Sequence, residues 1–399
     1  MDLAKYAKLL EAAVKPIGMD GVVELVTAQA KIDAAIARIL IPNPVRKPEP
    51  DTSEAALLRS EYRVANFQYR TDEFENLLGW CNSDKAYAWR LVHGDSGRGK
   101  TRLVVEVCQH LNGTGTGNHW LAGFVDVARF QDGLEAFDML FDTNKPLCII
   151  LDYAERQSDI VTELLKRSRR RAIDHPDTIT RVLLVARRRS DIWEQIFRQD
   201  SDLHTLSRTA LEDFQLTSVM AAYEIKDVFL AAYRDFAAHF RKSAEPPEVD
   251  FSRLSTAGNV PDIGLVHMLA LMAVLAPDEL SHGRNARPTQ DDILSFLLDR
   301  EKRHWCKAAR AMNLPIEVQA ENVLAEAAAA ITLTSQQGAI ANAVDARNVL
   351  RVCTLLAGQN EAVLDRIVAL FRETYPGIGY VNGVAPDLLG DYLIMMHEG

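Results

Sequence analysis

The chain has 399 residues, a hydrophobic content of 48% and a formal net charge of −10 at pH 7. Because single hydrophobic cores stop growing at roughly 250–300 residues, a chain of this length is expected to contain more than one domain. The acidic balance argues against a broad positively charged surface, so we do not expect nucleic acid as a partner.

The sequence also bears on compartment and on metals. The start, MDLAKYAKLLEAAVKPIG, lacks the unbroken apolar region of a secretory signal peptide, and the longest apolar run, residues 265–276, is too short to span a bilayer. We therefore expect a cytoplasmic protein with no membrane span, and the cysteine spacing predicts no zinc site. The cysteines have no C-x-x-C spacing and are expected to be reduced and mostly buried: Cys81, Cys108, Cys148, Cys306 and Cys353.

A short helical segment followed by a proline-rich linker is expected over residues 1–48. Between Val22 and Leu40, apolar residues recur at helical spacing and form a face that so short a segment cannot bury alone. The stretch IPNPVRKPEPD, residues 41–51, contains prolines that neither a helix nor a strand tolerates, so it is expected to be a boundary. The helices before it are candidates for contacting a separate effector or sensor protein.

A nucleotide-binding unit is predicted over residues 49–204, where strand and helix patterns alternate as in a parallel α/β sheet covered by helices on both faces. Residues 94–101 match G-x-x-x-x-G-K-[ST], the loop in which backbone N–H groups surround phosphates, the lysine reaches the β- and γ-phosphates and the hydroxyl holds Mg²⁺. A strand-like run precedes the motif and a helical pattern follows it, as this loop requires. The candidate nucleotide-binding residues are Gly94, Asp95, Ser96, Gly97, Arg98, Gly99, Lys100, Thr101 and the adjacent Arg102.

The next strand-like run, PLCIILD at residues 146–152, ends in a carboxylate. A buried strand would deliver Asp152 to the carboxyl edge of the sheet, where ligands of open α/β sheets bind. Thr101 and Asp152 are therefore the predicted Mg²⁺ ligands, and Glu155 is a candidate for orienting or deprotonating the attacking water. The alternative for Glu155 is a solvated loop carboxylate.

A third run, RVLLVAR at residues 181–187, ends in a guanidinium. Beside the Asp152 strand, Arg187 would lie near the γ-phosphate and report its presence. The following Arg188 and Arg189 are interpreted as surface charges, and the basic run LKRSRRRAIDH, residues 165–175, as a solvated helix face. The candidate catalytic residues are thus Lys100, Asp152, Glu155 and Arg187.

The remainder of the chain is predicted to be helical. Residues 205–318 are typical of a helical bundle, with IGLVHMLALMAVLA as a buried helix and ILSFLLDREKRHW as an amphipathic one. His267 and His304 lie on these helices and are interpreted as structural residues. Residues 319–399 are expected to form shorter helices of a winged-helix-like domain, with TYPGIGYVNGVAP, residues 374–386, as its wing.

Several of these segments together resemble one family. GDSGRGKTRL, the strands ending in LDYAE and LLVAR, and the flanking LLRSEYRVANFQYRTDEFENLLGWC, LLDREKRHW and PDLLGDYLI resemble the STAND class of signalling P-loop ATPases, in its bacterial NB-ARC/NACHT-like branch. The resemblance extends over residues 55–395. It implies an NTPase core, a helical bundle and a winged-helix-like domain that hold ATP or ADP with Mg²⁺ where they meet. The C-terminal repeats with which such proteins usually sense a trigger do not appear in this sequence.

Some positions depart from the family pattern. The family segment F-x-G-R-x-x-E-L lies over the nucleotide base; here it begins at Phe67, with Tyr69 in place of the glycine. Arg70 matches the arginine of that segment and is a candidate nucleotide contact. Where the family often has proline before leucine, this chain has Gly264 before Leu265, and the C-terminal MMHEG lacks the aspartate of the family's Met-His-Asp signature.

The resemblance implies a slow, Mg²⁺-dependent ATPase that works as a switch. On a trigger it would exchange ADP for ATP, open, and self-associate to activate an effector, with bacterial defence as a common family role. Because positioning and charge neutralisation serve motors and switches alike, the loop does not separate the two uses. Two alternatives stay open: an active AAA-like ATPase that remodels DNA or protein, and a scaffold whose nucleotide is structural and not hydrolysed.

Overall fold

The computed structural model describes most of the chain after residue 38. The described residues are 39–42, 44–113, 120–127, 140–189, 214–216, 222–243, 245–254, 261–281, 287–316, 320–336, 340–377 and 379–397. The helices predicted for residues 1–38 and the predicted domain boundaries near 204 and 318 lie outside these residues, so they stay predictions. Among the helices of the described ranges, none combines the length and the apolar character needed to cross a bilayer.

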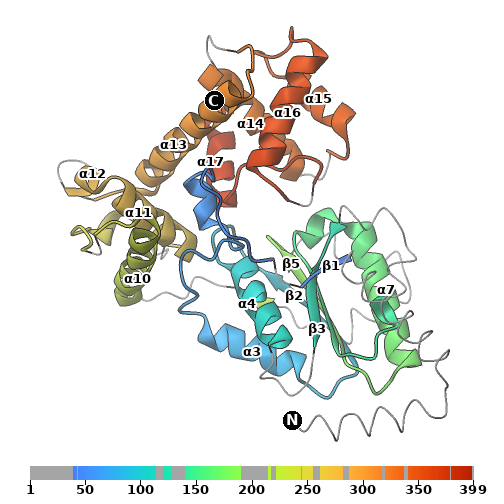
Figure 1. Cartoon of the computed structure of the whole chain (residues 1–399). Coiled ribbons are helices and arrows are strands. Elements are labelled where there is room, and N and C mark those ends of the chain that lie inside the picture. Colours follow the sequence, from blue (N-terminus) through green and yellow to red (C-terminus); the bar gives the residue numbers. More distant parts are fainter. Residues whose placement is uncertain are drawn as a thin grey trace, which may run out of the picture.

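A mostly parallel sheet organises the first half of the chain (Figure 1). Its six strands lie in the order β1-β3-β4-β5-β2-β6, and β1 alone runs antiparallel to its neighbour. This confirms the predicted α/β sheet. The strands are β1 (Leu40–Ile41), β2 (Tyr87–His93), β3 (Leu121–Val125), β4 (Leu147–Leu151), β5 (Thr180–Ala186) and β6 (Phe214–Gln215).

The central strands are buried on both faces. All five residues of β4 are fully buried, which explains why its sequence LCIIL is continuously apolar instead of alternating. In β5, Leu183 pairs with Ile150 of β4 on one side and with Arg90 of β2 on the other. β5 thus lies between β2 and β4, and the carboxyl ends of all three meet at the same edge of the sheet.

Helices cover both faces of the sheet, as predicted. On one face, α3 (Thr71–Cys81) and α4 (Lys100–Asn112) bury leucine and valine side chains against alternate residues of β2, β4 and β5. On the other face, α7 (Ser158–Asp174) does the same with Ile160, Val161 and Leu164 (Figure 1). Burying each such side chain stabilises the fold by roughly 1.5–3 kcal/mol. The two helix layers therefore hold the central strands, and the residues at their carboxyl ends, in place.

One residue of the basic run on α7 was predicted wrongly. Arg171 is 2% exposed and is not part of a solvated face. Its guanidinium donates to the carbonyl oxygens of Phe141, Thr143 and Lys145 at 2.7–3.0 Å. The basic run hid this role because a buried arginine that caps loop carbonyls has the same sequence context as an exposed one, such as Arg170.

The second half of the chain is a helical assembly with a continuous hydrophobic core. α11 is apolar on all sides and buried, as predicted, and it packs on α10 and α13. The turn η1 (Ala55–Leu58) belongs to the same core, so the chain passes through this assembly between β1 and β2. The helices are α10 (Ala222–Phe240), α11 (Ile263–Leu275), α12 (Pro277–Ser281), α13 (Gln290–Ala311), α14 (Ala320–Gln336), α15 (Ala343–Arg351), α16 (Glu361–Thr374) and α17 (Asp387–His397).

Three local predictions differ from the structure. Leu40–Ile41, at the edge of the predicted linker, forms β1 and pairs with β3. Phe214–Gln215, in the segment predicted to be wholly helical, forms β6 and extends the sheet beside β2. The predicted wing contains no strand in its described part, residues 374–377 and 379–386, and packs on α14 through the Val384 N–H, which donates to the Thr332 hydroxyl at 3.0 Å.

A buried polar network joins α13 to the C-terminal helices. The indole N–H of Trp305 donates to the Tyr375 hydroxyl at 2.7 Å, and that hydroxyl donates to the carboxylate of Glu301. Burial raises the pKa of Glu301 to about 7, although hydrogen bonds from Tyr375 and Ser53 act in the opposite direction. The network therefore places a titratable group inside the core that holds the C-terminal helices.

Candidate functional site: the phosphate-binding loop and its cavity

Residues 94–99 connect β2 to α4 and form the predicted loop. Gly97 and Gly99 have φ values of 80° and 81°, in the left-handed region that glycine adopts without strain. At Gly94, whose φ is 156°, a Cβ atom would lie 2.6 Å from the carbonyl oxygen of Leu216. Backbone conformation thus requires glycine at positions 97 and 99, and the close approach of the Leu216 carbonyl requires it at position 94.

Lys100 is the first residue of α4, and its ammonium group bends back over the loop. Its Nζ donates to the carbonyl oxygens of Gly94 and Asp95 at 2.6 and 2.8 Å. Burial lowers the pKa of Lys100, although Asp387 and Asp152 raise it. The ammonium group of Lys100 thus lies against the backbone of the loop.

Thr101 and Asp152 lie together, as predicted from the strand ends. The Thr101 hydroxyl donates to one carboxylate oxygen of Asp152 at 3.0 Å, and the backbone N–H of Tyr153 donates to the other at 3.0 Å. Burial raises the pKa of Asp152 to about 6 despite these hydrogen bonds. In phosphate sites Mg²⁺ binds only one or two protein side chains, and in P-loop proteins these are a hydroxyl and an aspartate. Thr101 and Asp152 therefore fit this ion.

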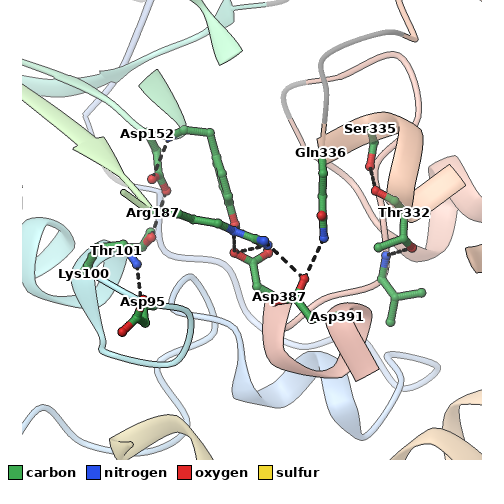
Figure 2. A network of polar contacts seen from close by, with 12 residues as sticks. Asp95, Lys100, Thr101, Asp152, Arg187, Thr332, Ser335, Gln336, Asp387 and Asp391 are labelled. Atoms are coloured by element: carbon green, nitrogen blue, oxygen red, sulfur yellow. Dashed lines mark hydrogen bonds and ion pairs between the residues drawn. The ribbon is translucent and has the colours of Figure 1, made fainter. Parts of the chain in front are cut away.

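Glu155 and Arg187 also meet at this edge, but they bond in an unpredicted way. One Glu155 carboxylate oxygen accepts from the backbone N–H of Arg187 at 3.2 Å, and the other is buried without a hydrogen-bond partner. The side chain of Arg187 pairs with two aspartates at the start of α17, Asp387 at 2.9 Å and Asp391 at 3.2 Å (Figure 2). Glu155 thus faces the sheet edge, whereas Arg187 links that edge to the C-terminal helices.

The α17 aspartates have further partners. The Tyr153 hydroxyl donates to Asp387 at 3.0 Å. The Gln336 side-chain amide at the end of α14 donates to Asp391 at 2.8 Å (Figure 2). Burial would lower the pKa of Arg187, but the two carboxylates raise it above its usual value, so this guanidinium stays charged. A charged network therefore runs from the residue after Asp152 to two helices of the C-terminal part.

Arg70, the candidate nucleotide contact, bonds to the backbone of the loop. It is 7% exposed, pairs with Glu73 and donates to the carbonyl oxygen of Arg98 at 3.1 Å. Tyr69, which stands where the resembled family has glycine, has a φ of 60°. This left-handed conformation gives a physical reason for the family's glycine, and the tyrosine adopts it with its side chain 41% exposed.

The rest of the loop is tied to α11. The Arg98 guanidinium pairs with Asp262 at 2.8 Å and more weakly with Asp95 at 3.5 Å. The Gly264 N–H donates to the Gly97 carbonyl at 3.0 Å, and a Cβ at Gly264 would lie 3.0 Å from the Gly97 Cα. The glycine in place of the family's proline thus permits close contact between α11 and the loop.

Arg102 and Ser96 complete the predicted set. Arg102 forms an ion pair with Glu106 at 2.9 Å, one turn along α4, and burial lowers its pKa. The Ser96 hydroxyl is buried without a hydrogen-bond partner. An unsatisfied hydroxyl inside a phosphate-binding loop is a donor available to a ligand.

Lys100, Thr101, Asp152, Tyr153 and Asp387 line one cavity of about 840 Å³, whereas Glu155, Arg187 and Asp391 lie outside its lining. The loop, the segment 57–70, α11 and the stretch 375–387 contribute to its walls, so the sheet and the helical assembly meet there. Six cations line it against three carboxylates, which favours an anionic ligand of small-molecule size. The cations are Arg59, Arg70, Lys100, Arg102, Arg156 and Arg372, and the carboxylates are Glu61, Asp152 and Asp387.

The histidines have different positions. His267 lines the cavity from α11, and burial lowers its pKa to about 4, so it is neutral near pH 7. His304 lies on α13 outside the cavity lining, and burial lowers its pKa as well. Neither histidine carries a charge to the site, in accord with their interpretation as structural residues.

Sequence reasoning missed Tyr153, Asp262, Asp387 and Asp391. The acidic pair at i and i+4 in PDLLGDYLI was visible, as was the tyrosine beside Asp152. Their roles were not, because the partner of the pair, Arg187, is 200 residues away in sequence. Only tertiary packing brings these groups together.

Comparisons with known proteins find distant structural similarity. No protein-family model matches the chain, and no curated protein matches it. The Orc1 protein of Aeropyrum pernix, solved in complex with DNA, is 13% identical with a TM-score of 0.41, over 88% of this chain and 98% of that one. Cdc6p from Pyrobaculum aerophilum is 11% identical with a TM-score of 0.37, over 86% and 99%, and PCH-2 of C. elegans is 12% identical with a TM-score of 0.34, over 65% and 76%. These values assign the chain to no family.

Proposed function

We propose that this protein is a P-loop ATPase of STAND type whose bound nucleotide decides whether its C-terminal helices stay docked on the sheet. The observation that carries the proposal is the ion pair of Arg187 with Asp387 and Asp391. It joins the end of β5 to α17 at a cavity that the phosphate-binding loop also lines. A ligand in this cavity would therefore lie against Asp387, one of the three groups that hold the end of β5 and α17 together.

The loop supplies the chemistry of nucleotide binding. Backbone N–H groups, Ser96 and Lys100 would hold the β-phosphate region, and Thr101 and Asp152 would hold Mg²⁺, which neutralises charge on the phosphates during transfer. Hydrolysis also requires an oriented water molecule. Glu155 has a buried carboxylate oxygen without a hydrogen-bond partner, and we assign the orienting role to this group.

Electrostatics gives the switch its direction. Asp387 lines the cavity, so the γ-phosphate of ATP would add negative charge beside a carboxylate and offer Arg187 a competing anion. Both effects weaken the ion pair that docks α17. ADP lacks this group, so the diphosphate favours the docked arrangement and the triphosphate favours release and self-association.

The test is the identity of the nucleotide that the purified protein carries. Denaturation followed by chromatography should release ADP in near-stoichiometric amount, and Lys100→Ala should abolish retention because it removes the ammonium group from the loop. An empty site with rapid turnover of added ATP would contradict the switch and favour an active remodelling ATPase. Retained nucleotide without any turnover would favour the scaffold.

A further inference from the structure

Arg156 is a cation of the cavity that no prediction used. It ends the turn η2 (Ala154–Arg156), four residues after Asp152, and its side chain lines the cavity. The guanidinium lies over the ring of Tyr153, with its carbon 4.4 Å from the ring centroid. Stacking occupies the face of the guanidinium and fixes its plane, whereas its five N–H donors lie in that plane and stay available.

Of the five other cations in the lining, four bond to a carboxylate or to the loop backbone, and the fifth, Arg372, lies on a helix of the C-terminal part. Three arginines pair with glutamates: Arg59 with Glu61, Arg70 with Glu73 and Arg102 with Glu106. Lys100 bonds to the loop, and Arg372 is exposed on α16 in the C-terminal part, over the ring of Tyr380. Within the described residues, Arg156 forms no ion pair with a carboxylate. It can therefore bind an anion beside Thr101 and Asp152 without first breaking an ion pair.

The backbone at Tyr153 places this stack. Tyr153 has a φ of 52°, a left-handed conformation that costs energy for a residue with a side chain. Its hydroxyl is held by Asp387 at 3.0 Å, and its backbone N–H by Asp152. A strained backbone conformation persists where surrounding contacts hold it, as these two hydrogen bonds do at Tyr153. In this conformation the Tyr153 ring and the Arg156 side chain both line the cavity.

We propose that Arg156 binds the terminal phosphate of a nucleoside triphosphate in this cavity, with Tyr153 as its positioning residue. The inference rests on the proposed function and extends it, since it names the group that recognises the third phosphate while Arg187 is still paired with α17. Arg156 thus acts before the C-terminal helices are released, and Arg187 becomes available to the phosphate after their release.

The experiment measures the affinities of the full chain for ATPγS and ADP, with Mg²⁺, by titration calorimetry. Arg156→Ala should weaken ATPγS binding about tenfold or more, the size expected for loss of a charge-assisted bond to phosphate, and should change ADP binding much less. Arg156→Lys keeps the positive charge and should restore part of the preference for ATPγS over ADP. Tyr153→Leu should resemble Arg156→Ala, whereas Tyr153→Phe, which keeps the ring but loses the bond to Asp387, should lie closer to the unaltered protein.

The matched control is Arg170→Ala, which removes an arginine that is 85% exposed on α7 and should leave both affinities unchanged. An unchanged ratio of ATPγS to ADP affinity in folded Arg156→Ala, or an equal loss for both nucleotides, overturns the proposal. If Arg156→Ala does not fold, the ratio in Arg156→Lys and Tyr153→Leu decides the matter in the same way. Failure of the unaltered protein to bind either nucleotide would instead overturn the proposed function itself.

Discussion

Asp152 and Glu301 are buried carboxyl groups whose pKa values are raised by burial, to about 6 and about 7. Asp152 faces a cavity lined by cations, where a bound metal would stabilise its charge. Glu301 faces Tyr375 and Trp305 inside a hydrophobic core, where Arg59 favours its charge and Glu54 opposes it. At the scale of single residues, the charge of Asp152 can be stabilised by a cation bound in the cavity, whereas the charge of buried Glu301 destabilises the fold.

Glu301→Gln should change how stability depends on pH. The native carboxyl group has a pKa of about 7 and the unfolded one 4.5, so between these values the native state binds more protons and the unaltered protein loses stability as pH rises. The loss approaches roughly 1.4 kcal/mol per pH unit and roughly 3 kcal/mol in total. Urea unfolding from about pH 5 to 8 should show the variant gaining relative stability over this window; parallel curves would contradict the assignment.

At the scale of elements, long patterns were predictable and short ones were not. The continuous apolar runs before Asp152 and Arg187 predicted β4 and β5, because strands buried on both faces have no other pattern. β1 and β6 have two residues each and exist only through their partners, so no local signal marks them. The site divides likewise: the loop residues follow from fixed spacing, whereas Asp387 depends on how α17 packs.

The loop between β2 and α4 allows a direct test of its backbone. Gly94→Ala would put a Cβ 2.6 Å from the Leu216 carbonyl and should destabilise the protein by about 1–3 kcal/mol while weakening nucleotide binding. Gly79→Ala in α3 is the matched control: its Cβ meets nothing within 4 Å, and alanine favours a helix, so stability should rise by about 0.5–1 kcal/mol. Equal effects of the two substitutions in thermal unfolding would refute the close approach at Gly94.

At the scale of the whole molecule, the sheet and the C-terminal helices are held by charged groups around the cavity. Arg187 pairs with α17, and Arg98 pairs with Asp262 before α11, so two helices of the assembly are bonded to the edge of the sheet that carries the loop. Figure 1 shows these helices as an assembly beside the sheet and not as a layer of it. Charged contacts respond to an added phosphate far more than apolar packing does, which is why we assign the switch to them.

The most direct test is small-angle scattering of monomer fractions saturated with ADP or with ATPγS, beside the Asp387→Asn, Asp391→Asn double variant. The account predicts a compact ADP form, an expanded ATPγS form, and a double variant that is expanded with ADP because Arg187 has lost both carboxylates. Identical scattering of the unaltered protein with both nucleotides, together with a double variant that stays compact, would show that the nucleotide does not control docking of the C-terminal helices.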